Sequence, residues 1–97
     1  MFAHWGTFTK AATLSNCLSF AEEALKANHF QIFELANDGD YVVIGGNNQV
    51  IITVACVPQP GNTWILVNAC SQDSATAELA RNQVREKIVT MVIFDDN

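Results

Sequence analysis

Four polar or aromatic side chains are the best candidates for chemistry in this chain: Glu34, Tyr41, Trp64 and Asn68. A carboxylate held beside aromatic rings in an apolar hollow has a raised pKa, and it can act as a base or orient a ligand. If Glu34 instead lies at the rim of a sheet, it is solvated, and Tyr41 and Asn68 satisfy an interface. Together with Leu66, these residues are our candidates for a ligand or interface site, and we expect none of them to be catalytic.

The histidines and cysteines do not follow the spacing of a known catalytic or metal site. His4 and His29 are the only histidines, and the three cysteines, Cys17, Cys56 and Cys70, are widely spaced. A thiolate nucleophile needs a histidine beside a cysteine, which these positions do not indicate. The spacings Cys-x-x-Cys and His-x-x-x-His, which are typical of metal sites, do not occur. We therefore expect neither a metal nor a cofactor, and we favour a protein that is not an enzyme.

Composition restricts the class of partner. The chain has 97 residues, enough for a single domain over residues 1–97. Five Lys and Arg against ten Asp and Glu give a net charge of −5. No basic cluster is present to bind a phosphate backbone, so we expect neither nucleic acid nor a membrane as a partner.

Location is inferred from the N-terminus and the cysteines. No segment approaches the roughly 18 apolar residues of a membrane span, and we expect no signal peptide, because the N-terminus lacks a basic region followed by a long apolar one. Three scattered cysteines are typical of buried, reduced thiols, so we expect a cytoplasmic protein. A disulfide or a reactive thiol is the alternative.

The predicted secondary structure centres on residues 41–70, a stretch without any charged side chain. Its β-branched, apolar runs predict strands at 41–44, 49–57 and 63–70, separated by turns at 45–48 and 58–61. Two further strands are expected at 2–9 and 30–36. The sequence Asp38-Gly39 favours a tight hairpin turn before the third strand.

Two stripes of apolar residues at three- and four-residue spacing predict helices. The first begins at about Thr13 or Ser15 and ends near Asn28. The second begins after a cap at Asp73 or Ser74 and continues to about residue 92, where an acidic tail follows. The β-branched run 88–94 could instead form a sixth strand, and we favour the helix because no turn residue intervenes.

These elements predict an α+β fold with two layers. An antiparallel sheet of about five strands carries two helices on one face, in the order strand, helix, four strands, helix. This order is similar to one repeat of the TATA-binding-protein-like fold and, more loosely, to helix-grip domains, and a ferredoxin-like fold with a C-terminal strand is the alternative. The similarity is one of topology alone, and a topology does not carry a function.

Side chains alternate along a strand, so the positions of the turns sort the sheet into two faces. With one turn centred near Pro60 and another between Asn47 and Asn48, one face lies under the helices and the other is open. The expected covered face is Phe33, Leu35, Val42, Ile44, Ile51, Thr53, Ala55, Val57, Ile65, Val67 and Ala69. The expected open face is Ile32, Glu34, Tyr41, Val43, Val50, Ile52, Val54, Cys56, Trp64, Leu66, Asn68 and Cys70.

An open apolar face predicts that something covers it. Charged residues make up 15% of the chain, below the roughly 25% of ordinary domains, so part of the surface is apolar. We favour a non-enzymatic domain that forms a homodimer through this face and binds a protein partner or a small apolar ligand. A small enzyme or ligand-binding protein with a pocket on the face is the alternative. A third possibility is an acidic, partner-specific module such as a secretion chaperone or a toxin-neutralising protein.

Overall fold

A computed structural model describes residues 1–34 and 41–91 of the chain. Its elements follow in this order: β1 (Phe2–Lys10), α1 (Leu14–Ala27), β2 (Gln31–Glu34), β3 (Val42–Gly46), β4 (Val50–Gln59), β5 (Asn62–Ser71) and α2 (Ser74–Thr90). The α+β class and the predicted order of elements are confirmed. The predicted turn at Asp38-Gly39 and the acidic tail lie outside the described residues.

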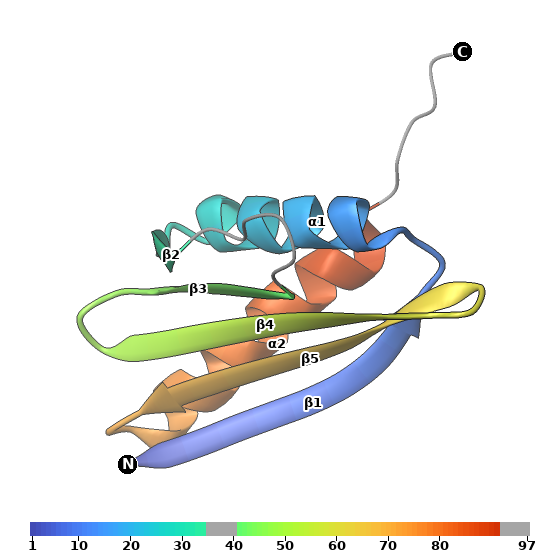
Figure 1. Cartoon of the computed structure of the whole chain (residues 1–97). Helices are drawn as coiled ribbons and strands as arrows, with labels where there is room; N and C mark the ends of the chain where they lie inside the picture. Colours follow the sequence, from blue (N-terminus) through green and yellow to red (C-terminus); the bar gives the residue numbers. More distant parts are fainter. Residues whose placement is uncertain (35–40, 92–97) are drawn as a thin grey trace.

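The five strands form a single antiparallel sheet in the order β1-β5-β4-β3-β2. The three hairpins β2–β3, β3–β4 and β4–β5 follow the chain, whereas β1 pairs with the last strand along its whole length, from Phe2 opposite Ser71 to Lys10 opposite Thr63. Figure 1 shows β1 at one edge of the sheet and β2 near α1 at the other. This order leaves β5, with its tryptophan and asparagine, one strand in from the edge.

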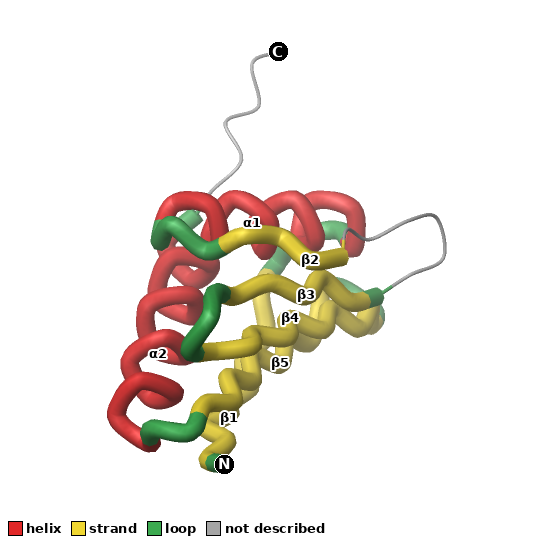
Figure 2. Tube along the Cα trace, turned by 90° about the vertical axis from the view of Figure 1, so that its left-hand side faces the viewer, coloured by secondary structure: helices red, strands yellow, loops and turns green. Residues whose placement is uncertain are grey.

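Both helices cover the same side of the sheet. The first helix contacts β2, β3 and β4, the second contacts β1, β5 and β4, and the two helices contact each other. In Figure 2 the helices lie along one side and the top of the sheet, and no described element covers the opposite side. The expected arrangement of two helices on one face is therefore confirmed.

Side chains at the helix ends fix where each helix begins and stops. The hydroxyl of Thr13 accepts a hydrogen bond from the Asn16 amide at 3.2 Å, and Asn28 follows the end of α1. The Asp73 carboxylate accepts from the Thr76 amide at 3.0 Å and so caps α2. The run 88–94 is helical as far as Thr90, slightly short of the predicted end near residue 92, and residues 92–94 lie outside the described part.

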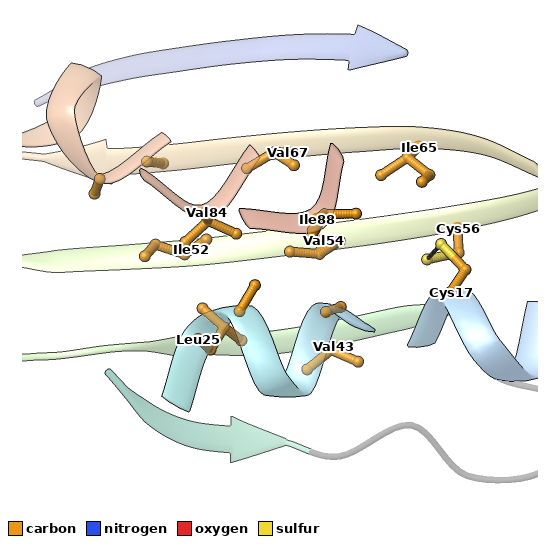
Figure 3. Packing of buried hydrophobic residues seen from close by; sticks show 14 of the residues in the cluster. Cys17, Leu25, Val43, Ile52, Val54, Cys56, Ile65, Val67, Val84 and Ile88 are labelled. Atoms are coloured by element: carbon orange, nitrogen blue, oxygen red, sulfur yellow. Dashed lines mark hydrogen bonds between the residues drawn. The ribbon is translucent and has the colours of Figure 1, made fainter. Parts of the chain in front are cut away.

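The core fills the space between the helices and the covered side of the sheet. Its largest fully buried side chains are Leu25, Val43, Ile52, Val54, Ile65, Val67, Val84 and Ile88. Figure 3 shows these side chains interdigitating between the helices and the central strands. Each such side chain contributes about 1.5–3 kcal/mol when it is removed from water, so this layer holds the helices on the sheet.

The faces of β3 and β4 are the reverse of those predicted. The buried residues include five that we expected on the open face: Val43, Val50, Ile52, Val54 and Cys56. The open side instead carries six that we expected under the helices: Val42, Ile44, Ile51, Thr53, Ala55 and Val57. The cause is the β4–β5 hairpin, in which Gln59 pairs with Asn62 across a two-residue turn. The prediction centred this turn on Pro60, and a shift of one residue moves every side chain to the other face.

Candidate functional site

The side of the sheet without helices is formed by alternate residues of four strands. By register its members are Ala3, Trp5, Thr7, Thr9, Val42, Ile44, Ile51, Thr53, Ala55, Val57, Trp64, Leu66, Asn68 and Cys70. We call this set the bare face. On these four strands it contains no lysine, arginine, aspartate or glutamate, and the backbone of Glu34, on the edge strand β2, is in register with Ile44. Trp5 is 64% exposed and Ile51 is 51% exposed, so large apolar groups face solvent there, which is typical of an interaction surface.

A hollow of about 350 Å³ lies on the bare face across β1, β5 and β4. Its lining residues are Trp5, Thr7, Thr53, Trp64, Leu66 and Asn68. The register explains why they meet, because Asn68 is directly opposite Trp5 on one side and Thr53 on the other. Directly opposite side chains in an antiparallel sheet lie about 5 Å apart. Three strands therefore bring two indole rings, an amide and two hydroxyls to one place.

The chemistry available in this hollow is recognition, not proton transfer. The threonine hydroxyls of Thr7 and Thr53 and the amide of Asn68 can donate and accept hydrogen bonds, but they do not titrate near neutral pH. The Asn68 amide nitrogen donates to the Cys70 sulfur at 3.5 Å, a weak interaction that orients the amide along β5. The two tryptophans supply large apolar surfaces with defined shape.

The structure brings together three of the five candidates from the sequence. Trp64, Leu66 and Asn68 lie on one side of β5 and line the hollow. Tyr41 does not line it: the residue precedes β3, its side chain is 48% exposed, and its carbonyl oxygen accepts from the Cys56 amide at 2.7 Å. Glu34 ends β2, with its backbone in register with Ile44 of β3.

The strand order separates Glu34 from the hollow. Between β2 and β5 lie two strands, and neighbouring strands are about 4.8 Å apart, so the backbone of Glu34 is roughly 14 Å from β5. The hypothesis of a carboxylate base beside Trp64 needs both groups in one pocket. The strand order separates the two backbones, and the residues that line the hollow include neither Tyr41 nor a residue of β2.

Three lining residues were not among the candidates from the sequence. Trp5 and Thr7 come from β1, which reaches the site only because it pairs with the last strand. Thr53 was expected on the covered face and lies on the open one because of the two-residue β4–β5 turn. The signal that could have found Trp5 is the alternation of aromatic and threonine residues in β1, which predicts that one side of that strand faces a partner.

One serine–histidine contact occurs away from the bare face. The His4 ring nitrogen Nε2 lies 2.9 Å from the Ser74 hydroxyl, at the point where β1 meets the start of α2. The neighbouring Asp73 carboxylate is engaged by Thr76, at 3.0 Å from its amide and 2.6 Å from its hydroxyl. No hydrogen bond to the other ring nitrogen of His4 occurs within residues 1–34 and 41–91, so nothing described there orients the imidazole as a base.

A side chain from the helix layer reaches the edge strand β1 beside the bare face. Arg81 of α2 donates from Nη1 to the carbonyl oxygen of Trp5 at 3.0 Å. It passes over Gly6, where a Cβ atom would come within 3.2 Å of that nitrogen. Edge strands present unpaired backbone groups to other chains, and Arg81 occupies one of them on β1.

The described part of the chain holds no group of three or more His, Cys, Asp or Glu placed to share a metal ion. Within the same ranges, no helix has the length and apolar character needed to cross a membrane. No protein-family model matches the chain, and no curated protein matches its sequence.

Proposed function

We propose that this chain is a non-enzymatic domain that forms a homodimer through the bare face, with the two sheets stacked. The observation that carries the proposal is a sheet surface that is uncharged on β1, β3, β4 and β5 and that exposes Trp5 and Ile51 to solvent beside the half-buried Trp64. Burial of each large apolar side chain is worth about 1.5–3 kcal/mol. Stacking a second sheet about 10 Å away is the standard way to bury such a surface.

The size of the bare face suits a second copy. Two of its strands have ten residues and one has nine, which corresponds to about 30 Å of length, and four strands are about 14–19 Å across. The face therefore measures roughly 400–600 Å² in projection, and its side chains expose more. Specific dimers bury roughly 600–1,000 Å² on each partner.

The net negative charge of the chain favours self-association through the bare face over association through its charged surfaces. Each copy has a net charge of −5, so two copies repel each other when charged surfaces approach. The bare face allows contact without placing like charges together. In a two-fold dimer the same groups meet across the axis, so Thr7, Thr53 and Asn68 can satisfy one another at the centre of an apolar interface.

The hollow supports a second candidate function, the binding of a small, flat, apolar ligand between Trp5 and Trp64. Its volume of about 350 Å³ is at the lower end of the range for ligand pockets, and Asn68 offers one directional hydrogen bond. We rank this function second because a ligand there leaves Ile51 and Val57, which do not line the hollow, exposed to water.

A cytoplasmic location belongs to the same proposal. Cys17, Cys56 and Cys70 are free, which fits a compartment that keeps thiols reduced. A protein partner on the bare face, in place of a second copy, is the outcome to distinguish from the dimer. Both arrangements use the same residues, so the distinguishing measurement is the mass of the isolated chain.

Light scattering after gel filtration tests the proposal. We expect a mass near twice 10.6 kDa for the unaltered chain and a monomer for Trp64→Arg, which places a charge at the centre of the face. The matched control is Leu79→Arg on α2, where an apolar side chain is 58% exposed, and it should leave the dimer intact. A monomeric unaltered chain at tens of micromolar would contradict the dimer. Retained dimerisation in Trp64→Arg would exclude the bare face as its interface.

A further inference from the structure

Two of the three cysteines lie in contact inside the core, where the proposed dimer does not use them. The sulfur atoms of Cys17, in α1, and Cys56, in β4, are 2.7 Å apart, and neither residue is exposed. Figure 3 shows the two side chains pointing at each other between the helix and the sheet. Two sulfur atoms that merely touch lie farther apart than this, so the pair interacts directly.

The third cysteine belongs to the opposite side of the sheet. Cys70 is in register with Ile51 on the bare face, whereas Cys56 is in register with Ile65 under the helices. The sheet therefore separates Cys70 from the other two thiols. Any intramolecular bond between cysteines in this fold has to join Cys17 to Cys56.

We propose that Cys17 and Cys56 are an oxidisable pair that forms an intramolecular disulfide when the protein meets hydrogen peroxide. The bond would join α1 covalently to β4. A disulfide bond is about 2.05 Å long, so its closure requires a movement of less than about 1 Å. The two groups already face each other in the reduced protein, and the pair is therefore a modification site built into the core.

The hydrogen bond between the thiols makes them chemically different. The contact with Cys56 lowers the pKa of Cys17, and the charge of Lys10 acts in the same direction, whereas burial acts in the opposite one. The pKa of Cys56 is raised, by the same hydrogen bond and by burial. The thiolate is the nucleophile in thiol oxidation, so Cys17 reacts first.

The oxidation balances with one peroxide molecule. The Cys17 thiolate attacks one peroxide oxygen, the O–O bond breaks, and a sulfenic acid and hydroxide form. The Cys56 sulfur then attacks the sulfur of the sulfenic acid, loses its proton and displaces hydroxide, which leaves as water. In total, two thiols and one hydrogen peroxide give one disulfide and two waters, and a small dithiol reverses the change.

Burial sets the kind of oxidant. Cys17 and Cys56 are fully buried. An oxidant must therefore be small, or it can reach the sulfur atoms only during a local opening of the helix. Hydrogen peroxide is close to water in size, whereas a tripeptide disulfide is not. The new bond closes a loop between residues 39 positions apart, which restricts the unfolded chain and stabilises the fold.

The experiment uses the full chain and Cys70→Ser, a change outside the core. Both reduced proteins are treated with hydrogen peroxide, denatured in an alkylating reagent and analysed by mass spectrometry. We expect two thiols in each protein to become resistant to alkylation and the mass of each chain to fall by two hydrogen atoms. Digestion should yield a peptide that joins Cys17 to Cys56. The Tm should rise by roughly 10 °C. Oxidised glutathione should act more than tenfold more slowly than peroxide.

A further variant tests whether an intramolecular disulfide forms without Cys17. Cys17→Ser combined with Cys70→Ser should form no intramolecular disulfide, and if it does not fold, the peptide map of the Cys70→Ser protein alone decides. The proposal is overturned if Cys17 and Cys56 stay alkylatable under conditions that oxidise Cys70. It is also overturned if the only cross-link joins Cys70 of two copies. The peptide that joins Cys17 to Cys56 lies within one copy, so its detection in the Cys70→Ser protein does not depend on whether the bare face forms a dimer.

Discussion

Arg81 of α2 and Trp5 of β1 are joined by a hydrogen bond of 3.0 Å between the guanidinium Nη1 and the backbone carbonyl oxygen of the tryptophan. The bond connects the helix layer to the edge strand that carries the indole of the bare face. Gly6 leaves the space through which the arginine reaches. The side chain thus ties β1 to α2 and occupies a backbone carbonyl of the edge strand, which fits the proposed association through the face of the sheet.

Replacement of this arginine tests that role. Arg81→Ala removes this bond and a second, exposed one from Nε to the Asn82 side chain. We expect it to lower the free energy of unfolding by about 0.5–1.5 kcal/mol and to increase assembly beyond the proposed dimer. Urea unfolding and light scattering measure the two effects. Gln83→Ala, at an exposed position on the same helix, is the control and should change stability by less than about 0.5 kcal/mol. Equal losses in both variants would show that the contact to Trp5 contributes nothing.

Two adjacent isoleucines test which face of β4 is covered. Ile52 is fully buried under the helices, whereas Ile51 is 51% exposed on the bare face. Ile52→Ala should cost about 2–5 kcal/mol of unfolding free energy, because it leaves a cavity. Ile51→Ala should cost less than about 1 kcal/mol when measured at a protein concentration too low for association. Denaturant unfolding of both variants checks the register, and the reverse ranking would restore the faces that the sequence predicted.

The β3–β4 hairpin depends on a glycine. Gly46 has a φ of 148°, and a Cβ atom there would overlap the carbonyl oxygen of Val50. That oxygen accepts a hydrogen bond from Asn47 at 3.0 Å within the turn. We expect Gly46→Ala to cost roughly 2–5 kcal/mol, since backbone strain and steric overlap add.

The control is Gly61 in the β4–β5 turn, where φ is 84° and no atom lies within 4 Å of a Cβ position. Gly61→Ala should cost only about 1–2 kcal/mol, because strain alone acts there. Thermal unfolding of both variants gives the comparison. If Gly61→Ala were the more destabilising change, the steric argument for Gly46 would be wrong.

The cap of α2 predicts a dependence on pH. The pKa of Asp73 is lowered by hydrogen bonds from the side chain and the backbone of Thr76. Because the folded pKa lies below the unfolded value, the carboxylate adds stability above about pH 4–5, and this contribution disappears as the pH falls through the folded pKa. The side chain is exposed, so the effect on Tm should be a few degrees at most.

Asp73→Asn keeps a capping side chain but removes the titrating group. We expect the difference in Tm between the two proteins to shrink as the pH falls from about 6 to 3. Glu23→Gln, which alters an exposed carboxylate of α1, serves as the control and should retain the acid-side loss of stability due to Asp73. A constant difference across this range would mean that the charge of Asp73 does not stabilise the helix.

Local patterns in the sequence were sufficient to predict the helices, the strands and the residues that cap the helices. The apolar stripe of α1 and the residues Thr13 and Asp73 mark the helices because helix geometry and capping act over a few neighbouring positions. The same locality explains why Trp64, Leu66 and Asn68 were correctly placed on one side of β5, since alternation along a single strand needs no distant information.

Residue patterns along the chain were thus enough to predict an α+β domain with a charge-free stretch at 41–70 and more apolar surface than two helices can cover. The residues that form the bare face and the hollow became clear only from the folded arrangement of the strands. The two-residue turn between Gln59 and Asn62 reversed the faces of β3 and β4, and the pairing of β1 with β5 brought Trp5 opposite Asn68. The contact between Cys17 and Cys56 was decided in the same way. These relationships depend on register and on contacts between distant segments, which no local pattern specifies.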